Sequence, residues 1–372
     1  MMSAEQAYPL ATADSDEILA LRQQASALRD LHWGDVVTYS RKVFVPLTNM
    51  CRDTCGYCTF VKPPGSPDAH IMSPEEVMAV VKEGERLGCK EVLFSLGEKP
   101  EKKYPEARAR LAELGYDTMV DYLRAMCQLV IDNTSMLPHV NAGTLSEEDV
   151  LKLRPVSASM GMMLENVSRR LMEKGQAHYA CPDKVPVQRL RTLELAGKYN
   201  VPFTTGILIG IGETWQERVD SLIAINEMHQ RYGHIQEVIV QNFRAKPGTA
   251  MADAPEPELE DMLLTLAVAR LILDPTISLQ APPNLQEHYK DYIFSGINDW
   301  GGVSPLTIDH INPERAWPKI QSLEFKTSEC GYRLQERLAI YPQYQNLPEK
   351  YLSAEMSLRL DALESQRTPL YA

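Results

Sequence analysis

The chain has 372 residues, 44% of them hydrophobic and 24% charged, and 38 lysines and arginines against 50 aspartates and glutamates give a net charge of −12. This composition is typical of globular proteins, and the acidic balance argues against a general nucleic-acid-binding or anionic-membrane surface, since such surfaces are basic. No apolar run approaches the roughly 20 residues that span a bilayer, and the polar, acidic start of the chain lacks the pattern of a secretory signal. We therefore expect a cytoplasmic, reducing environment, in which clustered cysteines are more often metal ligands or redox groups than disulfides.

The chain begins with a segment, residues 1–40, that is expected to be helical. Over residues 16–33, apolar side chains recur on one side of a predicted amphipathic helix, at Ile18, Leu19, Ala25, Leu28 and Leu31. We expect this segment to decorate a single larger domain.

Short apolar runs then alternate with helix-like segments over residues 41–318. The expected strands are residues 42–47, 91–96, 136–140, 156–160, 203–209, 237–241, 276–280 and 292–297. Helix-start signals occur at Ser73, Ser146 and Glu213. This alternation predicts a parallel α/β domain, and eight strands favour a (β/α)8 TIM-type barrel, complete or partial. A doubly wound open sheet is the competing arrangement, and the pattern alone does not exclude it.

A C-terminal helical extension is expected over residues 319–372. It includes helices at residues 330–340 and 353–363, separated by a stretch rich in proline and tyrosine at residues 341–348. Because this stretch is short, it indicates a boundary between two packed segments and not a long linker.

Three cysteines stand within eight residues after the first expected strand, at Cys51, Cys55 and Cys58, in the spacing CxxxCxxC. On one irregular loop, three thiolates can converge on a single metal centre. Tetrahedral zinc usually takes four ligands, which here would need His70, whereas a 4Fe-4S cluster held by three thiolates leaves one iron open to a substrate or cofactor. Burial of the three cysteines as small apolar side chains is the other alternative. The remaining cysteines form no second pair and are expected to pack in the interior: Cys89, Cys127, Cys181 and Cys330.

This motif, with Tyr57 just before its last cysteine, resembles the signature of the radical S-adenosylmethionine (SAM) superfamily. The resemblance implies two cofactors, a 4Fe-4S cluster and SAM, which chelates the open iron. One electron then cleaves SAM to methionine and a 5′-deoxyadenosyl radical, so that the difficult chemistry belongs to the cofactors and the protein supplies orientation.

The resemblance extends to three later segments that imply contacts with SAM. Residues 95–98 resemble the family's GGE-type segment, with Leu96 in place of the first glycine, and imply that Glu98 meets the methionyl amino group. By the same resemblance, Ser159 and Glu165 lie near the ribose or methionine, and Gly210 and Ile211 flank the adenine within a GxIxGxxE-like segment. Ordinary loop roles are the alternative for these residues. This segment lacks the third glycine of a GxGxxG dinucleotide site, which we reject.

From about Tyr39 to Tyr344 the chain resembles one subgroup, subunit 1 of 7,8-didemethyl-8-hydroxy-5-deazariboflavin (FO) synthase. The segments that carry the resemblance are residues 39–49, 94–101, 241–249, 280–285, 296–302, 312–318 and 331–338. The resemblance implies a partner, FO synthase subunit 2, which joins a hydroxybenzyl unit from tyrosine to 5-amino-6-(D-ribitylamino)uracil. Subunit 1 then converts this adduct to FO with loss of ammonia, a lyase-type reaction that needs a low-potential electron donor.

A polar, uncharged ribityl-uracil substrate suits amide and carboxylate side chains near strand ends. The residues that meet this description are Asn141, Gln241, Asn242, Arg244, Gln280, Asn284, Asn298 and Asp299. His70, His139 and His310 are candidate proton donors, although a lone histidine is more often structural. The rival hypotheses are a related radical SAM enzyme (FO synthase subunit 2 or a menaquinone-pathway type) and a non-catalytic metal-binding scaffold.

Overall fold

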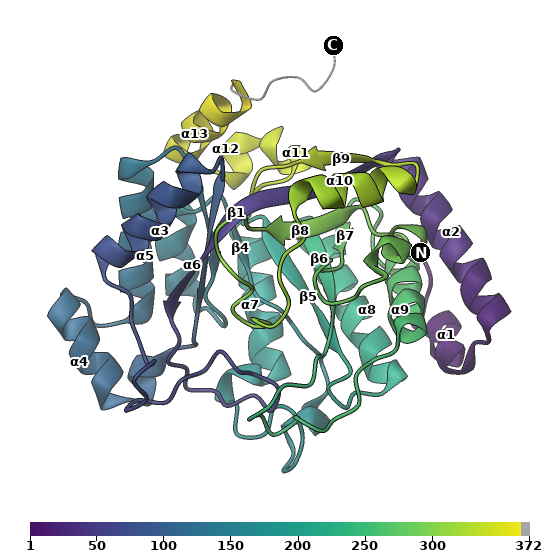
Figure 1. Ribbon diagram of the computed structural model, residues 1–372, viewed down its shortest axis with the longest axis horizontal. Coiled ribbons are helices and arrows are strands. Elements are labelled where there is room, and N and C mark those ends of the chain that lie inside the picture. Colours follow the sequence, from purple (N-terminus) through teal and green to yellow (C-terminus); the bar gives the residue numbers. More distant parts are fainter. Residues whose placement is uncertain (366–372) are drawn as a thin grey trace.

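The computed structural model describes residues 1–365, and its centre is a closed barrel of eight parallel strands (Figure 1). The strands follow one another around the barrel in chain order, and β1 pairs with both β2 and β8, which closes the ring. The complete (β/α)8 barrel is thereby confirmed, and the open sheet is excluded. The strand bounds are β1 Val36–Thr48, β2 Glu91–Leu96, β3 Leu137–Asn141, β4 Ser159–Gly161, β5 Phe203–Ile209, β6 Ile235–Asn242, β7 Ser278–Gln280 and β8 Asp299–Val303.

Helices surround the barrel, so that the strands are covered on their outer side and β5, for example, is buried at every position. Two of the expected helix starts are confirmed, because Ser73 and Ser146 cap α3 and α6 with their side chains, and the third cap is Thr214, one residue beyond Glu213. The helices are α1 Ala4–Ala7, α2 Ser15–Trp33, α3 Pro74–Arg86, α4 Pro105–Leu114, α5 Met119–Asn133, α6 Glu147–Leu153, α7 Pro186–Lys198, α8 Trp215–Tyr232, α9 Leu259–Ile272, α10 Ile320–Glu329, α11 Pro342–Gln345, α12 Pro348–Tyr351 and α13 Ala354–Ser365.

The last barrel strand does not lie where the sequence predicted it. Residues 292–297 fall largely in a 3-10 helix, Tyr289–Ser295, and the strand is formed by Asp299–Val303. Two glycines, Gly301 and Gly302, weaken the strand signal of the true segment, whereas the apolar side chains of the 3-10 helix pack under α2. The fourth strand is displaced in the same direction, since residues 154–156 form a 3-10 turn and β4 starts at Ser159.

The helix expected at residues 330–340 is wrong. This segment contains a ninth strand, β9 Arg333–Glu336, which runs parallel to residues 36–39 of β1 outside the barrel. The chain then enters the N-terminal end of the barrel, where residues 337–341 are buried. In Figure 1, α11, α12 and α13 lie at the opposite end of the molecule from the long loops that follow β1 and β6. Residues 366–372 of the expected extension lie outside the described residues.

The N-terminal helix is confirmed as α2, which packs against α9. Its buried face is made of Ile18, Leu21, Ala25 and Arg29, whereas Leu19 and Leu31, which we expected on that face, are 50% and 79% exposed. Among the described residues, no helix is both long enough and apolar enough to cross a membrane.

Candidate functional site

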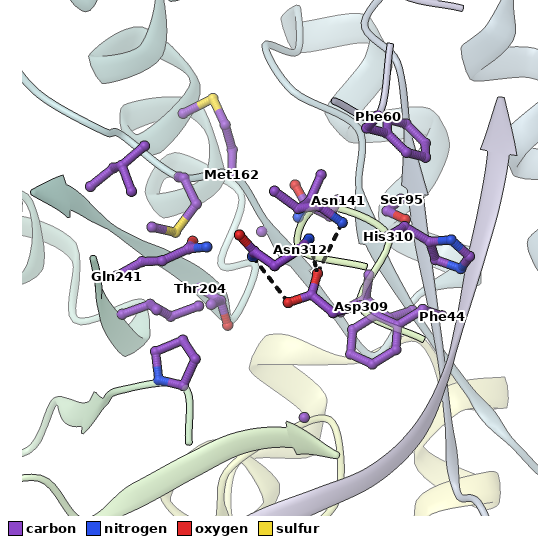
Figure 2. Close-up of a pocket in the computed structure, with 18 of the residues that line it drawn as sticks. Phe44, Phe60, Ser95, Asn141, Met162, Thr204, Gln241, Asp309, His310 and Asn312 are labelled. Atoms are coloured by element: carbon purple, nitrogen blue, oxygen red, sulfur yellow. Dashed lines mark hydrogen bonds between the residues drawn. The ribbon is translucent and has the colours of Figure 1, made fainter. Parts of the chain in front are cut away.

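A cavity of about 360 Å³ occupies the barrel and reaches the C-terminal ends of the strands, which is where enzymes with this fold place their chemistry. Its lining includes all three cysteines of the CxxxCxxC motif, together with side chains from most of the strands. Figure 2 shows that Asn141, Met162 and Gln241 surround one common space, with Phe44, Phe60 and His310 on its other side.

The cysteine loop follows β1 and is held against the end of β2. Cys51 Sγ accepts a hydrogen bond from the backbone N–H of Glu98 at 3.1 Å, and the N–H of Cys58 donates to the carbonyl of Cys55 at 3.0 Å. Gly97 makes this close approach feasible, because a Cβ atom there would overlap Met50 and lie 2.9 Å from Cys51 Cβ. The loop and the second strand therefore fix the cysteines as one unit.

The donor set fits a cluster that takes three protein ligands. The side chain of His70, which a zinc site would need, lines a separate pocket on the outer surface and lies 2.9 Å from Glu76. Cys181 Sγ lies 3.8 Å from Cys55 Sγ, but Cys181 does not line the cavity. Its proximity to Cys55 was not foreseen, although its burial agrees with the packing role expected of it.

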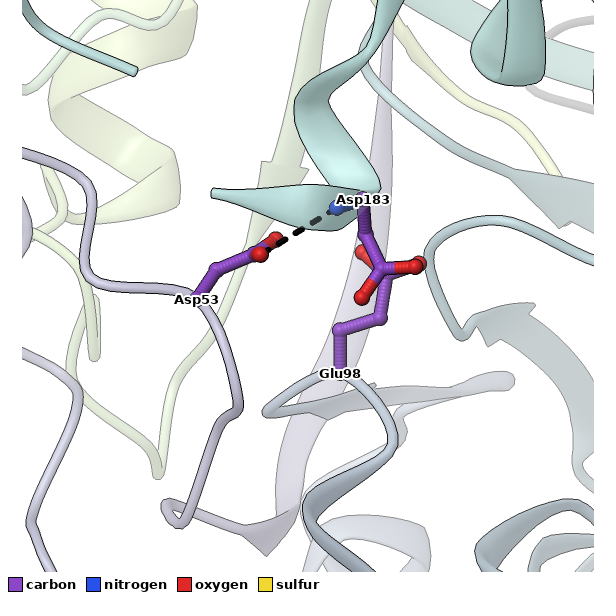
Figure 3. A group of neighbouring side chains, drawn as sticks. All are labelled: Asp53, Glu98 and Asp183. Atoms are coloured by element: carbon purple, nitrogen blue, oxygen red, sulfur yellow. Dashed lines mark hydrogen bonds between the residues drawn. The ribbon is translucent and has the colours of Figure 1, made fainter. Parts of the chain in front are cut away.

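Three buried carboxylates meet beside the cysteine loop, with oxygen atoms within 4.8 Å of one another: Asp53, Glu98 and Asp183 (Figure 3). Three cations balance them, since Arg52 pairs with Asp183, Lys99 Nζ lies 3.7 Å from both Glu98 and Asp183, and Arg189 lies 3.8 Å from Glu98. Burial raises the pKa of Glu98, although the charge of Arg189 opposes the rise. Glu98 thus lines the cavity next to Cys51, and its contact with a cofactor stays a prediction.

Tyr57 and Glu165 also line the cavity and contact each other. The Tyr57 hydroxyl lies 3.1 Å from His178 Nε2, and Lys184 Nζ donates to Glu165 at 2.7 Å. Burial alone would raise the pKa of Glu165, but the charges of Lys184 and Arg189 outweigh it and hold that pKa below its usual value. Glu165 is therefore a carboxylate that can accept hydrogen bonds from a bound hydroxyl.

Three of the residues expected at the cofactor do not line the cavity: Ser159, Gly210 and Ile211. The backbone N–H groups of Gly210 and Ile211 donate to the Glu213 carboxylate at 2.9 and 2.8 Å, and the Ile211 side chain packs behind Tyr57. Ser159 is fully buried and bonded to His139 and to the carbonyl of Ala339. Whether these residues contact SAM stays a prediction.

Five of the expected substrate residues do line the cavity: Asn141, Gln241, Asn242, Arg244 and Gln280. Asn284 lies outside it and donates a hydrogen bond to Asp309 at 2.9 Å. Asn298 precedes β8 and Asp299 begins it, so the expectation that they follow a strand end is wrong. Asn298 bonds Arg270 at 2.7 Å and Asp299 bonds Arg337 at 2.6 Å, which makes both part of the buried framework.

Several lining residues were missed by sequence reasoning. Phe44 and Trp317 stack with ring centroids 5.3 Å apart, and the loop between β8 and α10 brings Asp309 and Asn312 to the cavity beside the expected His310. Period-two alternation along β1 marks Lys42 and Phe44 as facing one side of the strand, which was a usable signal for these two. Nothing local marks the loop residues, because their position depends on how the loop folds back over the strands.

The radical SAM superfamily profile matches residues 45–224 of the chain. An FO synthase from Nocardia farcinica is 46% identical over 99% of this chain, and one from Streptomyces coelicolor is 47% identical over 99%. These alignments cover 44% of each relative, so the chain spans less than half the length of these curated FO synthases. The 7,8-didemethyl-8-hydroxy-5-deazariboflavin synthase of Methanopyrus kandleri is 52% identical over 83% of this chain and 92% of its own length.

Solved structures share the fold. The maturase HydG from Carboxydothermus hydrogenoformans superposes with a TM-score of 0.74 at 18% identity, covering 94% of this chain and 79% of its own. Methylornithine synthase (PylB) gives 0.70 at 16% identity, covering 90% and 94%. Whereas these structures show the fold alone, the 52% identity over 92% of the Methanopyrus enzyme shows the family. The chain belongs to the 7,8-didemethyl-8-hydroxy-5-deazariboflavin synthase family of the radical SAM superfamily, and its cofactors are a 4Fe-4S cluster and SAM.

Proposed function

We propose that this enzyme completes the deazaflavin chromophore by acting on 5-amino-5-(4-hydroxybenzyl)-6-(D-ribitylimino)-5,6-dihydrouracil. Its product is FO, formed with loss of ammonia. One observation carries this proposal: the three cysteines and three amide side chains line the same cavity. The amides are those of Asn141, Gln241 and Gln280. Amides can pair with the alternating donors and acceptors of a uracil ring.

In this proposal Cys51, Cys55 and Cys58 hold the cluster, and Glu98 accepts hydrogen bonds from the amino group of SAM. When bound, the cluster and SAM supply a 5′-deoxyadenosyl radical. Tyr57 and Glu165 are proposed to line the nucleoside part of SAM, since both face the cavity next to the cysteines. The barrel wall keeps water away from the radical by burying this end of the cavity.

The balance of atoms defines the reaction. Relative to FO, the adduct carries one ammonia and two further hydrogens. One hydrogen would leave the adduct as an atom, and the other would leave as a proton that ends on ammonia. The adduct radical formed between these two losses would also give up one electron, which balances the electron that the low-potential donor supplies. When bound, the cofactors would supply the radical that takes up the hydrogen atom, with one SAM consumed for each FO formed. We propose that His310, which lines the cavity, exchanges this proton with the adduct.

We further propose that FO synthase subunit 2 supplies the adduct and that a low-potential donor supplies the electron. The matched FO synthases are more than twice as long as the part that aligns with this chain, which supports a second unit in those proteins. Coupling between the two subunits would protect the adduct between the two reactions.

The test is anaerobic reconstitution with iron and sulfide, followed by reduction in the presence of SAM and the synthetic adduct. We expect 5′-deoxyadenosine and fluorescent FO in equal amounts. Formation of 5′-deoxyadenosine without FO would refute the proposed substrate while leaving the superfamily assignment intact. A parallel reaction with tyrosine and 5-amino-6-(D-ribitylamino)uracil should give no adduct, and its appearance would identify a subunit 2 activity instead. Zinc in place of iron would support a metal-binding scaffold.

A further inference from the structure

The part of the cavity farthest from the cysteines is charged and deeply buried. We call this region the cavity floor, and its side chains are those of Lys42, Glu91, His139, Thr204, Glu237 and Arg337. Lys42 Nζ lies 2.7 Å from Glu91 Oε1, Arg337 Nη2 lies 2.9 Å from Glu237 Oε1, and Thr204 Oγ1 donates to Glu237 at 3.0 Å. Barrel interiors of this type are ordinarily packed with branched apolar side chains, so this polar layer needs an explanation.

The ion pairs explain how these side chains stay charged when buried, but they do not explain why charged residues occupy the barrel interior. Replacing a buried ion pair by apolar side chains of similar volume is often neutral or stabilising, so stability alone does not favour the floor. The floor also lines the same cavity as the cysteines, and the proposed contacts with SAM do not use it. A polar ligand group that reaches down the barrel would use it.

His139 Nε2 faces this space, and it has no hydrogen-bond partner among residues 1–365. The Ser159 hydroxyl donates to the carbonyl of Ala339 at 2.7 Å, so it can only accept from His139 Nδ1, which lies 2.7 Å away. Nδ1 therefore carries the hydrogen. Burial lowers the pKa of His139 to about 4, so the ring is neutral near pH 7 and Nε2 is an acceptor.

Glycine at position 161 leaves Nε2 accessible. Gly161 lines the cavity, and a Cβ atom there would lie 3.0 Å from His139 Nε2 and 3.2 Å from the carbonyl of Thr204. Any larger side chain would cover the acceptor. The floor thus offers ammonium and guanidinium donors, carboxylate acceptors and one imidazole acceptor within a single pocket.

The cavity has a different chemistry beyond the floor. Phe44, two residues after Lys42 on β1, stacks on Trp317, and the amides of Asn141 and Gln241 follow the floor residues His139 and Glu237 toward the C-terminal ends of β3 and β6. Figure 2 shows Asn141, Gln241 and Thr204 around the same space. A flat aromatic ligand suits the upper part of the cavity, whereas a chain of hydroxyls, each both donor and acceptor, suits the floor.

We propose that the cavity floor binds the ribityl chain of the substrate, with His139 Nε2 accepting a hydrogen bond from one of its hydroxyls. This inference rests on the proposed function, and it places the reactive ring system toward the cysteines. His139 is then a residue that selects substrates by their polyol chain.

The test compares two ligands on the reconstituted holoenzyme with SAM and without reductant. One ligand is FO, and the other is the same deazaflavin with a methyl group in place of the ribityl chain. In the His139→Asn variant, the amide can keep the hydrogen bond to Ser159, but no acceptor replaces Nε2. In His139→Gln, the longer side chain can place its amide near the position of Nε2. Fluorescence titration should show FO binding about tenfold weaker in H139N, the loss of one hydrogen bond, and within about threefold of wild type in H139Q. The methyl analogue should bind all three proteins equally.

The control is His70→Asn, the same change at an exposed histidine outside the cavity, and it should bind both ligands as wild type does. Uncoupled formation of 5′-deoxyadenosine should persist in H139N. Two results would overturn the proposed role of the floor: equally weakened binding of both ligands by H139N, or unchanged binding of FO by H139N. In either case, production of FO by the wild-type enzyme would still support the proposed function. A wild-type enzyme that binds neither ligand and makes no FO would overturn both.

Discussion

At the scale of single residues, the cysteine site depends on which thiols face the cavity. Cys55 and Cys181 have sulfur atoms 3.8 Å apart, but only Cys55 lines the cavity. We predict that Cys55→Ala abolishes iron binding and the formation of 5′-deoxyadenosine, whereas Cys181→Ala retains both. Iron and sulfide assays after anaerobic reconstitution check this, with the two variants as a matched pair. Loss of iron in C181A would mean that Cys181 is itself a ligand.

At the scale of elements, the segment after β9 closes the N-terminal end of the barrel. Arg337 is buried there between Glu237 and Asp299, at 2.9 and 2.6 Å, and its neighbours in the chain bond to strand residues, as in the hydrogen bond from Gln236 to the carbonyl of Ala339 at 3.1 Å. One cation therefore ties the C-terminal segment to strands β6 and β8.

We predict that Arg337→Met lowers the free energy of unfolding by about 3–5 kcal/mol, because it leaves two buried carboxylates without their counter-charge. Adding Glu237→Gln and Asp299→Asn to this variant should restore most of the loss, since the carboxylates are then neutral. Urea denaturation of the anaerobic holoenzymes measures both values. If Arg337→Met alone is as stable as the wild type, the segment after β9 is held by its apolar contacts and not by Arg337.

At the scale of the whole molecule, buried histidines connect stability to pH. His234 is fully buried between Phe203 and Tyr232. Burial lowers the pKa of His234 from 6.5 to about 3. Because the folded-state pKa lies below that of the unfolded chain, the contribution to stability is complete above pH 6.5 and is lost as the pH falls toward 3.

We predict that this residue alone accounts for a loss of about 2 kcal/mol in unfolding free energy between pH 7 and pH 5. His234→Leu should therefore be less sensitive to acid than wild type by that amount. Urea denaturation at the two pH values gives the difference, and most carboxylates contribute little in this window because they titrate below it. Parallel losses in variant and wild type would contradict the prediction.

Much of the architecture could be predicted because its signals are local. The cap at Ser73, the β-branched and apolar run of β5 and the spacing of Cys51, Cys55 and Cys58 are properties of contiguous segments. The errors occurred where a local signal was weak or misleading. Gly301 and Gly302 weakened the signal of the last strand. The segment at 330–340 indicated a helix, although residues 333–336 form a strand and the residues that follow are buried in the N-terminal end of the barrel.

The sequence by itself determined the alternation of strands and helices, the cysteine loop and the resemblance to the family, because periodicity and motif spacing do not depend on distant contacts. Only the tertiary structure decided that Cys181 lies beside Cys55, that Asn298 and Asp299 belong to the framework, and that Arg337 forms the floor of the cavity with Lys42 and Glu237. These residues are far apart in the chain, and they meet because closing the barrel turns the same face of every strand toward one interior.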